Sequence, residues 1–384
     1  MAIRNNFNSL FQKFEKKYAT HNLIEVSKSA LLANLEIFKK ISDASVIPVL
    51  KSNAYGHGIR LTAEALKDQD IPYIAVDGYF EALRIREVSS QPILIMGAIM
   101  PENYKKIKYE KFAFVVDNKT SINALGKTGK RVKVHLECNT GMNRYGAKPD
   151  ELPELVGLIL QYNNLELEGI MSHLADSDGS DEQTVADAVK MYDKCVEKVL
   201  SMGAKPTLFH VAQTAGVLKA KSKYANAFRL GIGLYGINPF PANHKLHSSL
   251  SGLRPALRLT STLTKVINLK KGDSVSYNYT FKAPKDMTIG IFPLGYYEGH
   301  NRELSNKGSV KIKDTFCPVV GRICMNHTMI DLNDSNGEVG SRVVIYSNNP
   351  KDKNSIDAIA QEFDLFNYGL LTALSHDIRK TLVE

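Results

Sequence analysis

The stretch at residues 45–77, SVIPVLKSNAYGHGIRLTAEALKDQDIPYIAVD, contains two short apolar runs separated by a segment in which apolar residues recur with helical spacing. Short runs rich in Val and Ile form buried strands, and strands that alternate with helices are typical of a parallel sheet covered by helices. These residues therefore predict a strand, a helix and a second strand of an α/β fold.

The same alternation continues on both sides of this stretch, up to about residue 240. Helical patterns such as KSALLANLEIFKKI and ADAVKMYDKCVEKVLSMG separate the apolar runs. We predict strands at residues 23–27, 45–53, 73–77, 92–96, 112–116, 131–137, 167–173, 207–211 and 228–236. About eight such units in one stretch favour a (β/α)₈ barrel of the TIM type over an open sheet.

After Pro239 the pattern changes to short strands separated by turn signals, as in ALRLTSTLTKVINLKKGD and RVVIYSNNP. This pattern predicts a mainly β C-terminal domain, closed by one final helical stretch from about Ser355. We therefore expect an N-terminal extension at 1–21, a (β/α)₈ barrel at 22–245 and a β domain at 246–384.

Composition excludes several classes of protein. The N-terminal residues lack the apolar core of a signal peptide, and no run of about eighteen apolar residues could cross a membrane. Four scattered cysteines suit a reducing cytosol better than a disulfide framework or a zinc site. The net charge of +9 comes from dispersed lysines, not from a basic run interleaved with aromatics. We expect a cytoplasmic protein with no metal, no nucleic-acid partner and no membrane partner.

The first candidate for chemistry is Lys51, which ends an apolar strand and precedes a glycine-flanked loop, SNAYGHG. Active sites of (β/α)₈ barrels lie at the C-terminal ends of the strands. A lysine there can form a Schiff base once its amine is activated. The alternative is an ordinary lysine at a strand end.

Four further residues follow later strands or lie within them. Arg144, in NTGMNRYG, offers a planar fork for a carboxylate, and Thr214, in QTAG, could hold a phosphate together with backbone N–H groups. His173 ends the run LEGIMSH, and a lone histidine there is more often structural than catalytic. Arg229 lies in an apolar run, FRLGIGLYG, where a buried arginine requires a partner. That partner could be a pyridine nitrogen.

The β domain adds VSYNYTF, GYYEG and GRICMNHTMIDL, which include Tyr277, Tyr296 and Met325. Tyrosines in strands usually pack, so these residues alone do not indicate a site.

Together these segments resemble the alanine racemase family, whose members are fold-type III pyridoxal-phosphate enzymes. The resemblance runs from about residue 22 to the C-terminus. Its most specific elements occur in the family's order: LKSNAYGHG, TGMNRYG, the histidine of SHLA, RLGIGLYG, SYNYTF, GYYEG and CMN.

The resemblance implies a role for each matching position. Lys51 would hold pyridoxal 5'-phosphate covalently, and Lys51 and Tyr277 would be the two catalytic bases. Arg229 would bond the pyridine nitrogen, and His173 would link Arg229 to Tyr277. The phosphate would be held by Tyr55, Thr214, Gly231 and Ile232. The substrate would face Arg144, Tyr296 and Met325. The opposing subunit of a homodimer would supply Tyr277 to a shared active site.

These implied roles suit racemisation. The Cα proton must leave from one face and return at the other, so two bases on opposite sides are required. An arginine cannot give the pyridine nitrogen a proton. The cofactor would then delocalise the carbanion less, which limits side reactions such as transamination.

Three departures from the family pattern stand out. The usual CMD reads CMN, which places Asn326 near the substrate mouth. Glu137 occupies the position of a lysine that family members often carbamylate, and we expect it to pair with Arg144 and orient it. His376 stands about where a tyrosine or proline is usual.

The sequence therefore predicts a pyridoxal-phosphate-dependent racemase that interconverts L- and D-alanine and so supplies a peptidoglycan precursor. A racemase with a broader range, or one acting on serine, stays open as the alternative. A non-catalytic pyridoxal-phosphate-binding protein would lack the second domain and Tyr277. A decarboxylase of the same barrel class would be expected to place an acid at the position of Arg229.

Overall fold

The computed structural model describes residues 18–109, 111–332 and 334–384, so most of the predicted N-terminal extension lies outside the described residues. The chain forms two compact units that are interleaved in sequence. Of the described residues, the barrel unit contains 26–109, 111–257, 348–372 and 382–384, and the β unit contains 18–25, 258–332, 334–347 and 373–381.

Eight parallel strands form the core of the barrel unit, in the order β2-β9-β8-β7-β6-β5-β4-β3. A parallel bridge between Val49 and Ala75 links the two ends of this sheet, which confirms the predicted barrel. The strands are β2 (Ser45–Pro48), β3 (Ile74–Val76), β4 (Ile93–Ile95), β5 (Phe112–Val116), β6 (Val132–Glu137), β7 (Leu165–Met171), β8 (Leu208–Gln213) and β9 (Ala227–Leu230).

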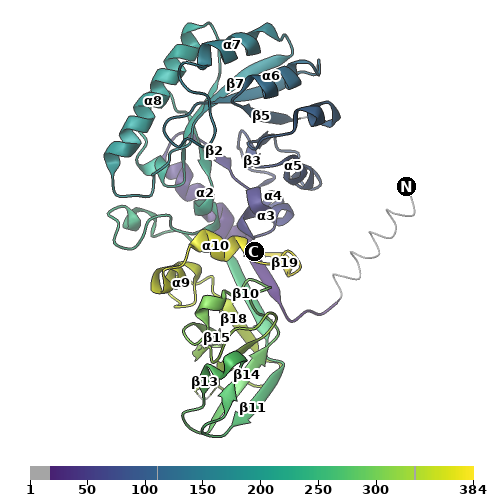
Figure 1. The fold of residues 1–384 in the computed structure, drawn as a ribbon, viewed down its shortest axis with the longest axis vertical. Helices are drawn as coiled ribbons and strands as arrows, with labels where there is room; N and C mark the ends of the chain where they lie inside the picture. Colours follow the sequence, from purple (N-terminus) through teal and green to yellow (C-terminus); the bar gives the residue numbers. More distant parts are fainter. Residues whose placement is uncertain (1–17, 110, 333) are drawn as a thin grey trace, which may run out of the picture. The chain divides into compact units, whose positions relative to one another are not determined.

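Helices cover the outside of these strands (Figure 1). They are α2 (Lys28–Ile41), α4 (Ile59–Leu66), α5 (Tyr79–Arg86), α6 (Lys119–Gly126), α7 (Leu152–Gln161) and α8 (Glu182–Ser201). Helix α2 shows why the sequence forms them. The side chain of Ser27 caps its first turn by accepting a hydrogen bond from the backbone N–H of Ala30, 3.1 Å away. Its buried residues Leu31, Leu35 and Phe38 recur with helical spacing on one face.

The β unit is mainly β-structure, as predicted. One sheet has the strand order β16-β15-β18-β10-β1-β19, a second has the order β11-β14-β17, and β12 pairs with β13. The strands are β1 (Leu23–Ser27), β10 (Leu257–Thr262), β11 (Lys265–Leu269), β12 (Ser274–Val275), β13 (Phe281–Lys282), β14 (Met287–Phe292), β15 (Ser309–Ile312), β16 (Thr315–Pro318), β17 (Thr328–Asp331), β18 (Arg342–Tyr346) and β19 (Arg379–Val383). Val275, Met287, Ile289 and Met329 form part of its apolar core.

Two expectations about individual elements were wrong. The run at 23–27 is a strand, but it joins the six-stranded sheet and not the barrel, because its neighbours there are β10 and β19. The chain also does not end in helix. Helix α9 (Ile356–Phe363) does start after Ser355, but α10 (Asn367–Thr372) and strand β19 follow it. None of the helices in the described ranges has the length and apolar character that crossing a bilayer requires.

Candidate active site

A cavity of about 530 Å³ opens within the barrel unit. Its wall includes every site residue that the sequence predicted in the barrel: Lys51, Tyr55, Arg144, His173, Thr214, Arg229, Gly231 and Ile232. These residues come from the ends of several strands and from the loops that follow them. These predicted residues bring one amine, two guanidinium groups, one imidazole and two hydroxyl groups to one cavity.

A left-handed turn directly after Lys51 shapes one side of this cavity. Ser52, Asn53 and Ala54 have φ values of 55° and Tyr55 has a φ of 50°, within the segment labelled α3 (Lys51–Tyr55). Left-handed helical backbone costs roughly 1–2 kcal/mol per residue for L-amino acids. The strain is supported locally, because the backbone N–H of Ser52 donates to Glu81 over 2.6 Å and the side chain of Asn53 accepts from Ile59 over 3.0 Å.

Tyr55 ends this turn with its side chain buried. Burial raises its pKa to about 12, so its hydroxyl group stays protonated and can donate a hydrogen bond. Its ring lies 5.0 Å from the ring of Tyr235 and 6.0 Å from that of Tyr368, measured between centroids. The turn thus presents Lys51 and the Tyr55 hydroxyl to the same cavity.

Opposite this turn, Thr214 and two glycines form a narrow cradle. The Thr214 hydroxyl oxygen accepts hydrogen bonds from the backbone N–H groups of Gly231 (3.2 Å) and Gly233 (3.3 Å). A Cβ on Gly231 would lie 2.9 Å from the Tyr55 hydroxyl, so any larger residue would push into this space. The segment that follows QTAG is a short 3₁₀ turn, Gly216–Leu218. The hydroxyl groups of Tyr55 and Thr214 therefore both lie close to Gly231, in space that a side chain at that position would fill.

Arg229 is buried inside the barrel and is 2% exposed. Its guanidinium donates to the backbone carbonyls of Ser172 (2.6 Å) and His210 (2.8 Å) and to His210 Nδ1 (2.7 Å). Burial lowers its pKa to about 10, which leaves it charged at neutral pH. A charged donor is thus held rigidly in the wall of the cavity.

His173 lies next to Arg229, with its Nδ1 atom 3.4 Å from the guanidinium. Burial, and then the positive charges of Arg229, Arg144 and Lys51, lower the pKa of His173 to about 3. The imidazole is therefore neutral at physiological pH and can accept a hydrogen bond from Arg229.

The expected ion pair between Glu137 and Arg144 is not formed. Among the described residues, no ion pair within 4.0 Å joins these two side chains. Glu137 is only 8% exposed, at the end of β6, whereas Arg144 is exposed. The loop that carries Arg144 is closed on itself, because the Asn139 side chain accepts from the N–H groups of Gly141 and Asn143.

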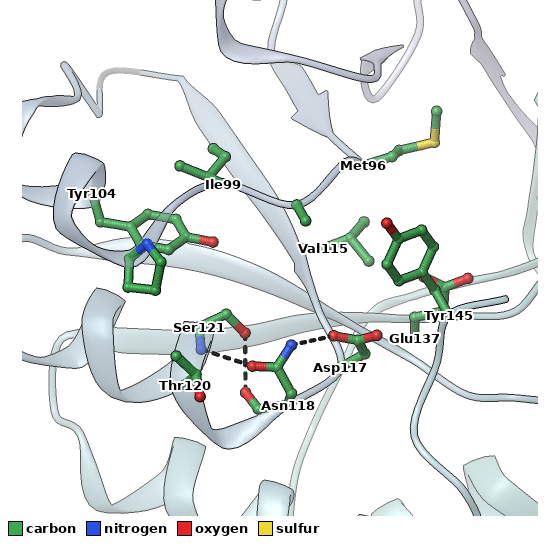
Figure 2. Close-up of a pocket in the computed structure, with 12 residues that line it drawn as sticks. Met96, Ile99, Tyr104, Val115, Asp117, Asn118, Thr120, Ser121, Glu137 and Tyr145 are labelled. Carbon is green, nitrogen blue, oxygen red and sulfur yellow. Dashed lines mark hydrogen bonds between the residues drawn. The ribbon is translucent and has the colours of Figure 1, made fainter.

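Glu137 also lines a second, smaller cavity of about 240 Å³, which shares Met96, Glu137 and Tyr145 with the first (Figure 2). Burial and the nearby Asp117 raise the pKa of Glu137, and the charges of Arg229 and Arg144 lower it, with a net upward shift. The carboxyl group therefore lies between two cavities with its charged form disfavoured.

The β unit gathers the other three predicted site residues around one segment, 322–325. Ser276, which precedes Tyr277, donates through its hydroxyl to the Arg322 carbonyl over 2.6 Å, and the Tyr296 backbone N–H donates to the Cys324 carbonyl over 3.0 Å. Tyr277, Tyr296 and Met325 are 65%, 42% and 54% exposed. Three large, solvent-exposed side chains thus lie on segments of this unit that contact one another.

The backbone around Tyr277 is unusual. Ser276, Asn278 and Tyr279 all have positive φ values, 67°, 59° and 50°. Such conformations are rare for residues other than glycine and cluster at functional positions. This local geometry projects Tyr277 outward and not into the β-unit core, so the expectation for an isolated tyrosine in a strand does not apply here.

Asn326 has a direct structural reason to be an amide. Its side-chain nitrogen donates to Glu298 Oε1 over 2.7 Å, and Glu298 Oε2 accepts from the backbone N–H of Gly295 over 2.8 Å. An aspartate at this position would place a second carboxylate beside Glu298. The change from CMD to CMN therefore fits the glutamate of GYYEG.

Sequence reasoning missed Tyr368, which lines the cavity from helix α10. In this part of the chain the sequence had drawn attention only to His376, as a departure from the family pattern, and His376 is exposed in the β unit. It also missed His135, Glu168 and His210, which are hydrogen-bonded inside the barrel. His135 and His210 each carried a local signal, because each lies between two apolar residues of a strand.

Known proteins resemble the whole chain. A family model described as alanine racemase, N-terminal domain, matches residues 26–239, and one described as alanine racemase, C-terminal domain, matches residues 256–382. A curated alanine racemase from Lactobacillus acidophilus is 33% identical over 371 residues, which covers 94% of this chain and 97% of that protein.

Solved structures resemble it in fold as well. An alanine racemase from Bacillus anthracis with bound L-Ala-P is 25% identical with a TM-score of 0.87, and the match covers 96% of each chain. A histidine racemase from Leuconostoc mesenteroides is 24% identical with a TM-score of 0.84, and the match covers 95% of this chain and 98% of that one. The second likeness shows the fold alone.

Proposed function

Since this chain belongs to the alanine racemase family, we propose that it is a pyridoxal-phosphate-dependent racemase that interconverts L- and D-alanine. The observation that supports this proposal most directly is the single cavity that collects Lys51, Arg229 and the cradle of Tyr55, Thr214 and Gly231.

The residues of the cavity fit pyridoxal phosphate. Lys51 supplies the amine that an aldehyde needs, and Arg229 supplies a charged donor for a ring nitrogen that carries no proton. The cradle has room where a Cβ on Gly231 would meet the Tyr55 hydroxyl, and it offers the hydroxyl groups of Tyr55 and Thr214 to a phosphate. Gly231 and Ile232 begin a 3₁₀ turn beside it.

When bound, pyridoxal phosphate would supply an aldehyde that joins the substrate amino group and a ring that withdraws electrons from Cα. The chain itself must then move the Cα proton. Lys51 Nζ would serve the face of the D-enantiomer and the Tyr277 hydroxyl oxygen the face of the L-enantiomer, since inversion requires bases on both sides. Arg144, exposed at the cavity, would face the substrate carboxylate.

We infer that the working form is a homodimer in which Tyr277, Tyr296 and Met325 of one subunit complete the cavity of the other. The support is that these three side chains are exposed and lie on contacting segments of the β unit. Large exposed apolar side chains that cluster together commonly mark an interaction surface.

We also infer a cytoplasmic location, supported by four free cysteines.

A racemase with a broader side-chain range is the second candidate. It is favoured by Asn326, because an amide bonded to Glu298 replaces the carboxylate that the family places near the substrate mouth. A histidine racemase shares the fold, so the fold does not decide between side chains.

Chiral chromatography of the products tests the proposal. The purified protein, supplied with pyridoxal phosphate, should convert L-alanine or D-alanine to an equal mixture, faster than it converts serine or larger amino acids. Borohydride reduction should fix the cofactor to the peptide that contains Lys51, and Lys51→Ala should remove both the label and the activity. Failure to invert any amino acid would overturn the proposal, and a faster reaction with serine would select the second candidate.

A further inference from the structure

The positive charge of Arg229 lies inside the barrel without an acidic partner in contact. Among the ion pairs of the described residues, none within 4.0 Å includes Arg229. A buried charge is costly unless it is paired or hydrogen-bonded. The neighbour that receives one of its N–H groups is an imidazole, His210, with Nδ1 2.7 Å away.

From His210 a row of hydrogen bonds continues through the barrel interior. His210 Nε2 lies 2.8 Å from His135 Nδ1, and His135 Nε2 lies 3.1 Å from Glu168 Oε2. The row crosses strands β9, β8, β6 and β7 in turn. Both imidazole rings are 0% exposed. No residue of this row other than Arg229 was singled out by the sequence.

The guanidinium at one end of the row and the carboxylate at the other determine which atom donates in each of the hydrogen bonds between them. A guanidinium can only donate, so His210 Nδ1 must accept and the proton of that ring must be on Nε2. This N–H donates to His135 Nδ1, which leaves the proton of His135 on Nε2. An ionised carboxylate can only accept, so the last N–H points at Glu168. One arrangement of protons therefore satisfies all three bonds, with both imidazoles neutral.

The environment of each member agrees with this arrangement. Burial, and then the charge of Arg229, lower the pKa of His210, and burial likewise lowers the pKa of His135. Burial raises the pKa of Glu168, but hydrogen bonds from His135, Lys133 and Tyr73 outweigh it and lower the value to about 2. Glu168 is thus a carboxylate at physiological pH.

Gly169 shows that the barrel makes room for this row. A Cβ at that position would lie 2.5 Å from His135 Nδ1, the atom that receives the bond from His210. Any other residue there would displace the ring. The space around His135 therefore depends on the absence of a side chain on the neighbouring strand.

We propose that His210, His135 and Glu168 are positioning residues for Arg229, and that Glu168 is a second, more distant counter-charge beside Glu137, acting through two neutral imidazoles of fixed proton arrangement. Every N–H in the row points away from the cavity. His210 therefore presents a lone pair to Arg229 and has no proton to pass toward a ligand that Arg229 binds. This proposal rests on the proposed function only for the identity of that ligand, pyridoxal phosphate.

Several other charged or titratable groups surround Arg229 and enter any test against pH. They are His173, Glu137, Arg144 and Tyr192. None of them is changed in the variants below.

Nuclear magnetic resonance of the wild-type protein with ¹⁵N-labelled histidine tests the proton arrangement without any substitution. His210 and His135 should both appear as neutral rings with the proton on Nε2, with and without pyridoxal phosphate, from about pH 6 to about pH 9. A protonated ring, or a proton on Nδ1 of either residue, would overturn the proposal even if the enzyme is a fully active racemase.

The counter-charge is tested by Glu168→Gln, since the amide oxygen can still accept from His135 while the charge is lost. The matched control is Glu166→Gln on the same strand, where the glutamate pairs only loosely with Arg131, 3.9 Å away at the surface. Pyridoxal-phosphate binding should be followed by absorbance as pH rises. For Glu168→Gln the pH at which binding is lost should fall by about one unit, the size of effect that a charge on the order of 10 Å away has in a protein interior.

The control should keep the wild-type value. An unchanged binding limit in Glu168→Gln would contradict the counter-charge role. If the wild-type protein binds no pyridoxal phosphate, the proposed function fails, while the imidazole spectra still decide the proton arrangement.

Discussion

The carboxyl group of Glu137 is buried between two cavities, and the pKa of this group is raised by burial. When the pKa of a carboxyl group is higher in the folded than in the unfolded state, the group destabilises the folded state as pH rises from the unfolded-state pKa to the folded-state pKa. We therefore expect Glu137→Gln to be more stable than wild type at pH 7.5, by about 2 °C in melting temperature. The gain should vanish below about pH 4, where the wild-type carboxyl group is protonated in both states.

Calorimetric melts of both proteins across this pH range check the expectation. A variant that is less stable at neutral pH would show that Glu137 makes a favourable ionic interaction after all, as the sequence had suggested for Arg144.

The amide of Asn326 offers a sharper substitution. Asn326→Asp removes the hydrogen bond to Glu298 and sets two carboxylates side by side, which should lower the free energy of unfolding by about 1–3 kcal/mol. The matched control is the double variant Glu298→Gln with Asn326→Asp, which exchanges the carboxylate and the amide and should recover most of the loss. Urea denaturation measures all three proteins. Equal losses in the single and double variants would mean that the contact contributes nothing.

The left-handed turn at 52–55 is an element that the sequence did not predict beyond a loop after Lys51. Its φ values of 50–55° suit glycine, so Ser52→Gly should be neutral or should stabilise the fold by up to about 1 kcal/mol. The matched control is Ala33→Gly in the right-handed helix α2, which should cost about 1 kcal/mol. Thermal melts should show no loss of melting temperature for Ser52→Gly and a clear loss for Ala33→Gly. A similar loss in both would show that the turn at Ser52 is not strained.

The barrel strands could be predicted because most are short apolar runs that are buried along most of their length, and such a run can be recognised without knowing which strands pair with it. The partners of a strand could not be read in the same way. LIEVS at 23–27 has the residue pattern of a barrel strand, yet this strand pairs with β10 and β19, which lie far away in the sequence. Pairing depends on contacts between distant segments, which a local pattern does not contain.

The site residues likewise fall into those that a local motif identifies and those that only the fold brings together. Lys51, Arg229 and Thr214 lie in motifs whose spacing carries the chemistry, so they could be chosen before the fold was known. His135, His210 and Glu168 carry no motif, and their relation exists only because three strands bring them together. The pairing of Glu137 with Arg144 failed for the opposite reason, since the two are close in sequence but the loop between them closes on Asn139.

For the whole molecule, mixing two impaired proteins tests the shared site. Lys51→Ala and Tyr277→Phe each remove one of the two proposed bases, but a hybrid of the proposed homodimer would contain one cavity with Lys51 and Tyr277 both intact. Random exchange of subunits should therefore restore about a quarter of wild-type activity, because about half of the dimers are hybrids with one working site of two. Racemisation rates before and after subunit exchange measure the recovery. No recovery, or full activity in a sedimenting monomer, would contradict a shared site.

The interleaving of the two units also has a consequence for synthesis. The barrel unit is completed by residues 348–372, which bring Tyr368 and Thr372 to the cavity wall, and the ribosome makes these only after residues 258–347 of the other unit. At about 5–20 residues per second, the eight strands of the barrel wait on the order of ten seconds for their last helices. A nascent chain that has already emerged with all eight strands therefore still lacks part of the wall of this cavity, and the β unit has time to fold before that wall is finished.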